Sequence, residues 1–183
     1  THTGYQPQAL PGYAQRALGH AGDQPKFMQR GDPVADWQFN DFLRSTAGMY
    51  STPADLLRFA VAHFECQQKP FNRVLAGNLV PRMARPVDAP AIQWVVDDVD
   101  GQHITHQVGL VSGYSGYIGL DAERRMAVVV LQNNFNWTDK IGHKLLHRLA
   151  AYYDAHPEQM QIRQPVQCPA TDTAGTTGRS ASS

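Results

Sequence analysis

The sequence is poor in cysteine and carries no excess charge of either sign. Its 183 residues include two cysteines, Cys66 and Cys168, too few for a disulfide framework or a four-thiolate zinc site. Sixteen basic and 16 acidic residues give a formal net charge of zero. This balance argues against a protein that binds nucleic acid through a basic face, so we expect no nucleic-acid partner.

Long apolar runs and the common cofactor motifs are also missing. No apolar run approaches the ~18 residues that cross a bilayer, so we expect no transmembrane segment. The sequence has no phosphate loop, no dinucleotide-binding fingerprint and no paired zinc cysteines, and therefore implies neither a metal nor an organic cofactor. Its length lies within the range of one domain with a substantial core.

The sequence before Gly48 is broken repeatedly by glycine and proline. No helical or alternating period persists there, which predicts irregular structure with at most one short helix. A helix is predicted from Pro53 to about Gln67, with Thr52 as its N-cap. Its expected apolar side comprises Pro53, Leu56, Leu57, Ala60, Val61 and Phe64. A further helical stretch is expected between residues 70 and 83.

From Ala91 onward the apolar residues follow the period of strands. Strands are predicted at residues 92–96, 103–108, 114–120 and 126–132. Asp100-Gly101 is a hairpin signal, because both residues tolerate positive φ. The connections are too short for parallel crossovers, so the pattern predicts an antiparallel meander.

A final helix is predicted from about Trp137 to Asp154, with an apolar stripe of Ile141, Leu145, Leu149 and Tyr152. Residues 162–183 are rich in Pro, Thr, Ser, Ala and Gly, and we expect them to form a disordered tail. The expected fold class is α+β: helices, then an antiparallel meander, then a C-terminal helix that covers the sheet.

Histidines four residues apart on the last helix suggest a metal site at first sight. His143 and His147 have the right spacing, but they share a face with Lys140 and Lys144, opposite the predicted apolar stripe. No third ligand stands at an obvious spacing. The favoured interpretation is a solvated helix face, and no metal ligands are predicted.

The segment from His106 to Tyr114 carries closely spaced glycines and several polar residues. Such glycines let another backbone, or a substrate, approach the edge of a strand. On the residues alone, a bulged hairpin with a solvent-facing polar side is favoured over a cleft-facing edge. Ser115 lacks the glycine two residues later that a nucleophile elbow requires, since Tyr117 stands there.

Two stretches resemble the serine β-lactamase-like hydrolases, which include class C β-lactamases, D-alanyl-D-alanine carboxypeptidases and related esterases. Residues 47–59, AGMYSTPADLLRF, are similar to the family's helix beside the active site. Residues 108–134, VGLVSGYSGYIGLDAERRMAVVVLQNN, are similar to its later strands. Residues 1–5 resemble the sequence that follows the family's mid-chain Pro-Leu-Gly-Met motif. The resemblance covers roughly residues 1–154.

The resemblance implies acyl transfer through a serine that a lysine or tyrosine activates. In this chain no serine has lysine three residues on, and no tyrosine is followed two residues later by asparagine. Both motifs belong to the first half of the family's chain. We therefore expect the nucleophile and its base to lie upstream, and no catalytic residue is assigned here. The seven serines are Ser45, Ser51, Ser112, Ser115, Ser180, Ser182 and Ser183.

The family's third motif, Lys-Thr-Gly or His-x-Gly, lies on the edge strand of the sheet. Gly109, four residues before Gly113, matches its glycine, and Gln107 then stands where the family carries Lys or His. His106 is one residue early, on the opposite strand face unless a bulge intervenes. The expected substrate-binding residues are Gln107, Gly109, His106 and Ser112. Without a cation at Gln107, an esterase-like or inactive member fits better than an enzyme that recognises a carboxylate.

The sequence is therefore interpreted as the C-terminal half of a β-lactamase-like serine hydrolase. Residues 1–161 are expected to form the C-terminal portion of the domain, completed by a missing N-terminal half. By resemblance, the parent is bacterial, periplasmic or secreted, and hydrolyses a small-molecule or peptide amide or ester. The alternative is a non-catalytic member of the penicillin-recognising fold, with a binding or structural role.

Overall fold

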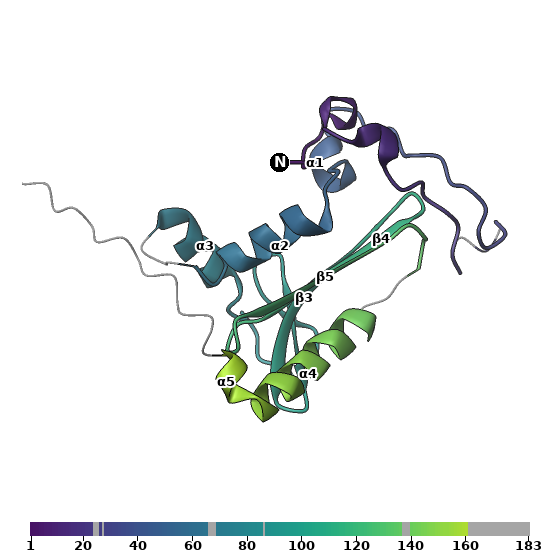
Figure 1. Cartoon of the computed structure of the whole chain (residues 1–183). Helices are drawn as coiled ribbons and strands as arrows, with labels where there is room; N and C mark the ends of the chain where they lie inside the picture. The colour runs from purple at the N-terminus through teal and green to yellow at the C-terminus, as the bar shows by residue number, and fades with distance from the viewer. Residues whose placement is uncertain (24–25, 27, 66–68, 86, 137–139, 161–183) are drawn as a thin grey trace, which may run out of the picture.

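The structure, a computed structural model, describes residues 1–23, 26, 28–65, 69–85, 87–136 and 140–160. A five-stranded sheet lies between helices on its two sides (Figure 1). The helical elements are η1 (Pro7–Ala9), η2 (Tyr13–Gln15), α1 (Arg44–Ala47), α2 (Pro53–Ala62), α3 (Pro70–Asn78), α4 (Lys140–Ala155) and α5 (Pro157–Met160). The strands are β1 (Ala89–Pro90), β2 (Val95–Val99), β3 (Gln102–Val111), β4 (Tyr114–Asp121) and β5 (Met126–Gln132). The fold is α+β, as predicted.

The sheet is an antiparallel meander in the order β1-β2-β3-β4-β5, which confirms the predicted topology. Asp100 and Gly101 both have positive φ, 53° and 81°, and form the predicted turn between β2 and β3. The first predicted strand was placed too early, because Gln93 has a φ of 63° and β2 starts only at Val95. The strand then continues through Asp97 to Val99.

Each face of the sheet has its own core, because side chains alternate along a strand. On the α4 face, Ile104, Met126 and Val128 pack with Leu146 and Ala150. On the opposite face, Trp94 and Leu120 pack with Ala60 of α2 and Leu79. Helix α2 contacts β4 and β5, so it covers that face over only part of its width.

The predicted apolar stripe of α4 is wrong except at Leu149, which is partly buried against the core. The buried residues of this helix are Gly142, Leu146 and Ala150, whereas Ile141, Leu145 and Tyr152 are 40–45% exposed. The helix is rotated because small residues contact the sheet: a Cβ on Gly142 would meet the ring of Tyr117. The side of α4 that is buried is therefore the one whose small residues allow the helix to approach the sheet closely. It is not the side that carries the row of largest apolar residues.

Helix α2 begins as predicted, since the Thr52 side chain accepts a hydrogen bond from Asp55 N at 3.2 Å. Its apolar side is narrower than predicted, because Leu57 and Val61 are both more than 40% exposed. Ala60 is its buried contact with the sheet. Helices α2 and α4 therefore both leave apolar side chains uncovered in the part of the chain that the structure describes.

The irregular N-terminal segment crosses the turn between β3 and β4 (Figure 1). His20 N donates to the carbonyl oxygens of Gly113 at 3.1 Å and Asn133 at 3.0 Å. Gly113 has a φ of 79°, and a Cβ there would lie 2.7 Å from backbone atoms of Gly19 and His20. Gly113, one of the glycines in the predicted glycine-rich segment, therefore lets the backbone of Gly19 and His20 approach closely.

The described helices include none that is both long and apolar enough to cross a membrane. The predicted disordered tail at 162–183 and both cysteines lie outside the described residues.

Candidate functional site

The end of strand β3 carries two of the predicted substrate-binding residues on one exposed face. Gln107 and Gly109 are both exposed, and their cross-strand partners are Ile118 and Gly116 of β4. Strand β2 pairs with β3 only as far as His106. This end of β3 is consequently left without a paired strand on its β2 side within the described residues.

Local hydrogen bonds hold the Gln107 side chain along the strand. Its Nε2 donates to the carbonyl oxygen of Gln93 at 3.2 Å, and its Oε1 accepts from Val108 N at 3.1 Å. Apart from Gly109 itself and its two chain neighbours, no heavy atom of the described residues lies within 4 Å of the position that a Cβ on Gly109 would take. An exposed amide beside an open backbone position can donate and accept hydrogen bonds to a polar ligand.

Ser112 does not join this face. It is buried, has a φ of 36°, and its hydroxyl donates to the carbonyl oxygen of Ala35. The hydroxyl therefore fastens the N-terminal segment to the hairpin turn. The structure gives Ser112 a structural contact with a distant part of the sequence and separates it from Gln107.

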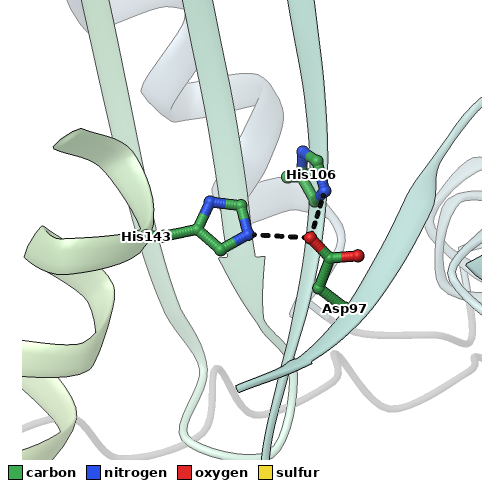
Figure 2. Close-up of side chains that lie close together, drawn as sticks. All are labelled: Asp97, His106 and His143. Atoms are coloured by element: carbon green, nitrogen blue, oxygen red, sulfur yellow. Dashed lines mark hydrogen bonds and ion pairs between the residues drawn. The ribbon is translucent and has the colours of Figure 1, made fainter. Parts of the chain in front are cut away.

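His106 lies on the opposite face of β3, where its side chain is buried against α4 (Figure 2). Its Nε2 lies 3.1 Å from Oδ2 of Asp97 on β2. The Nε2 of His143 on α4 lies 3.1 Å from the same oxygen. Because an ionised carboxylate can only accept, each imidazole donates to it. The structure brings these three side chains together from three elements.

The surroundings keep Asp97 ionised within this cluster. Burial of the carboxyl acts to raise its pKa, but the Asp88 N–H, which donates to Oδ1 at 2.7 Å, and the two imidazoles outweigh burial. The pKa of Asp97 is therefore below its ordinary value. The ring of Tyr117 stacks on His106 with centroids 5.9 Å apart, and meets His143 at 5.6 Å.

The interpretation of His143 as part of a solvated face is wrong, because its side chain is only 15% exposed and contacts Asp97. Among the described residues, Asp97, His106 and His143 are a group whose ligand atoms all lie within 4.8 Å of one another. His147 is exposed and instead pairs through Nδ1 with Oε1 of Gln102 at 3.3 Å. The two histidines that the sequence pairs by spacing are thus separated by the structure.

Sequence reasoning missed Asp97 altogether, although one signal was present. The Asp100-Gly101 turn sets the register in which Asp97 opposes Ile104. His106 shares a face with Ile104, which places it diagonally across from Asp97. His143 carried no comparable signal, because its participation depends on the rotation of α4.

The serine just before α2, Ser51, makes a structural contact. Ser51 Oγ lies 2.8 Å from Thr3 Oγ1, and Thr3 in turn donates to Asp55 at 2.9 Å. Hydrogen bonds from His2 N and then from Thr3 hold the pKa of Asp55 below its usual value. This part of the molecule ties residues 1–3 to the start of α2 and contains no serine–lysine pair.

Comparison with known proteins places these features in a family. Residues 1–152 match the family model described as beta-lactamase. A β-lactamase/D-alanine carboxypeptidase from Pseudomonas syringae has a similar structure, with a TM-score of 0.64 and 16% identity over 83% of this chain. A class C β-lactamase from Rhodobacter sphaeroides gives 0.59 and 16% over 87%. No curated protein matches the sequence.

The chain spans about half the length of these two structures, 49% and 50% respectively. The residues that match the family model extend from the N-terminal segment into α4. The chain belongs to the β-lactamase family.

Proposed function

We propose that residues 1–161 form the C-terminal portion of a serine hydrolase domain that cleaves an amide or ester bond through an acyl-serine intermediate. The open end of β3, with Gln107 and Gly109 exposed on one face, is the observation that carries this proposal. Family membership supports the reaction class. The nucleophilic serine and the group that accepts its proton are supplied by an N-terminal half.

In the complete domain, the end of β3 binds the substrate beside the acylated serine. The Gln107 amide donates a hydrogen bond to the substrate, and the absence of a Cβ at Gly109 lets the substrate lie close to the strand. Because an amide brings no positive charge, the preferred substrate is a neutral ester or amide. No role in substrate binding is proposed for His106, which faces α4, or for Ser112, which is buried.

Uncovered apolar side chains support the existence of a completing half. Phe71 and Val74 of α3 are more than 60% exposed, and Ile141 of α4 is 43% exposed. Within the described residues, strand β5 lies at the edge of the sheet and pairs with β4. Unpaired edges and apolar surface favour association, so we expect the 183-residue chain alone to associate, or to melt at a lower temperature than the completed domain.

The direct test is intact-mass spectrometry after incubation with a labelled penicillin or an activated serine-hydrolase probe. The 183-residue chain alone should gain no covalent adduct, because none of its seven serines stands in a Ser-x-x-Lys motif. The same chain expressed with the sequence encoded immediately upstream should gain one acyl group. A stoichiometric adduct on the isolated chain would contradict the proposed location of the nucleophile.

The second candidate is a non-catalytic member of the family. The replacement of the family's cation by Gln107 favours it, since a protein that only binds does not need to orient a substrate carboxylate for acyl transfer. The upstream sequence separates the two proposals: Ser-x-x-Lys followed by Tyr-x-Asn indicates an enzyme. Their absence, together with no adduct on the complete protein, indicates a binding or structural role. In either case we propose that the protein acts outside the cytoplasm.

A further inference from the structure

We infer that Asp97, His106 and His143 bind a divalent transition-metal ion of the zinc type, which fastens α4 to the sheet. The three side chains supply one carboxylate oxygen and two imidazole nitrogens (Figure 2). This combination is one that zinc, cobalt and nickel accept in proteins. The site is separate from the exposed face of β3 and stands apart from the proposed hydrolysis.

The spacing of the ligand atoms suits such an ion. Tetrahedral zinc with bonds of about 2.0–2.2 Å places neighbouring ligand atoms about 3.3 Å apart. Both Nε2 atoms lie 3.1 Å from Asp97 Oδ2, and all three atoms lie within 4.8 Å of one another. Small side-chain movements would therefore bring an ion into contact with all three.

The supporting contacts resemble those that orient metal ligands. The second carboxylate oxygen of Asp97 is held by Asp88 N at 2.7 Å. The Tyr117 ring stacks on His106 and limits the directions in which that imidazole can turn. Second-sphere contacts of this kind fix ligands before a metal arrives. The ligand side chains are 7–15% exposed, so an ion can still reach them and a water molecule can complete the coordination.

The location gives the metal a structural role. Its ligands come from β2, β3 and α4, and Asp97 and His143 are 46 positions apart in the sequence. An ion bound there links the last helix to the sheet across a long stretch of sequence. Because the unfolded chain does not hold these three side chains together, metal binding should stabilise the folded state.

The test is titration of the chelator-treated 183-residue chain with zinc chloride by calorimetry, together with cobalt chloride by visible absorption. We expect one equivalent of zinc, a cobalt spectrum typical of low coordination number, and a higher melting temperature with zinc. Asp97→Asn, His106→Gln and His143→Gln should each weaken binding by more than the ~10–100-fold typical of a second-sphere change. Asp97→Asn keeps the volume of the side chain and one acceptor oxygen.

Two matched controls distinguish this site from the other histidines. His147→Gln removes the second ligand of an alternative site in which His143 and His147 of α4 would bind the metal together. His103→Gln removes an exposed imidazole beside Asp98 and Glu123. Both variants should bind zinc as the unmodified chain does. Loss of binding in either control, with binding retained in Asp97→Asn, would overturn the assignment.

A measurement on the unmodified chain removes the dependence on variants that fail to fold. Cobalt or nickel at one equivalent should broaden the imidazole NMR signals of His106 and His143 before those of His103 and His147. Absence of saturable binding, or broadening of the exposed histidines first, would show that Asp97, His106 and His143 form a hydrogen-bonded cluster only.

Discussion

On the α4 face of the sheet, large apolar side chains are buried and polar side chains are hydrogen-bonded. The opposite face is covered by α2 at one end and exposed to solvent at the other. Ile104 and Leu146 are fully buried on the α4 face, and Asp97 is hydrogen-bonded to two histidines there. On the α2 face, Trp94 and Leu120 are buried, yet Gln107 and Gly109 of the same sheet are exposed.

This difference separates residues that hold the fold from residues that are available to a ligand. Neighbouring positions on β3 belong to different faces, since a strand alternates with period two. A substitution at His106 therefore acts on the packed face, and one at Gln107 acts on the open face. The comparison can be tested with pairs of adjacent residues that differ mainly in the direction of their side chains.

The largest expected effect on the free energy of unfolding comes from a substitution on the α4 face of the sheet. Leu146→Ala removes a side chain that contacts the core formed with Ile104 and Met126, and should lower the free energy of unfolding by ~2–5 kcal/mol. Chemical denaturation followed by circular dichroism measures the loss. The matched control is Leu145→Ala, one residue away and 40% exposed, which should cost about 0.5 kcal/mol. Equal losses would show that α4 is rotated differently from the structure.

A second substitution tests the junction between the N-terminal segment and the β3–β4 turn. Gly113→Ala places a side chain on a residue with a φ of 79° and 2.7 Å from the backbone of Gly19 and His20. The left-handed backbone alone costs about 1–2 kcal/mol for an L-residue, and the clash adds to it. We expect faster hydrogen exchange at Ala21 and Val34, whose amides bond within this segment.

Gly109→Ala is the matched control for that substitution, because its added Cβ would meet no described residue other than its chain neighbours within 4 Å. It should leave hydrogen exchange in the N-terminal segment unchanged. Similar exchange rates in the Gly113→Ala and Gly109→Ala variants would contradict the close packing of the segment on the turn.

The closed end of the α2 face should make stability depend on pH. His63 is buried between the rings of Phe59 and Trp94, and burial lowers its pKa below 6.5. The unfolded chain therefore takes up this proton more readily than the folded chain. The contribution of neutral His63 is present above pH 6.5 and is lost as the pH falls toward the lowered pKa.

Denaturation of the unmodified chain and of His63→Gln, each well above and well below pH 6.5, measures that contribution. The unmodified chain should lose more stability on acidification than the variant does. The comparison of differences is needed because other groups also titrate in the same range. An identical loss in the two proteins would mean that His63 is as accessible to protons when folded as when unfolded.

The strands and the helix caps could be predicted from the sequence because their determinants are local. Asp100-Gly101 fixes a hairpin by its own backbone preferences, and Thr52 caps α2 through a residue three positions away. The order of strands then follows from short connections. These features need no knowledge of what packs on the sheet.

The rotation of α4 and the cluster around Asp97 could not be predicted in the same way. A stripe through Ile141 and Leu145 follows the apolar pattern, but the contact of Gly142 with Tyr117 selects a different side. His143 faces Asp97 only as a consequence. Of the predicted binding residues, Gln107 and Gly109 lie together, while His106 and Ser112 are placed elsewhere by strand alternation and by the turn.

The smallest effect on the free energy of unfolding is expected at Gln107. Comparing it with the adjacent His106 tests directly whether the two side chains lie on different faces of the sheet. Gln107→Ala should change the free energy of unfolding by less than about 0.5 kcal/mol, since the side chain is exposed. His106→Ala removes a buried partner of Asp97 and should cost about 1–3 kcal/mol. Chemical denaturation of both variants measures the difference.

In a complete protein that is a hydrolase, the order of the two effects reverses for substrate binding: Gln107→Ala should have a larger effect on KM than His106→Ala. Gln107→Ala should raise KM for a neutral ester because a hydrogen-bond donor to the substrate is lost. Gln107→Lys, which restores the family's cation, should shift preference toward substrates that carry a carboxylate. A Gln107→Ala variant that unfolds more readily than His106→Ala, with an unchanged KM, would show that the face assigned to substrate is structural, and that the binding edge lies elsewhere in the domain.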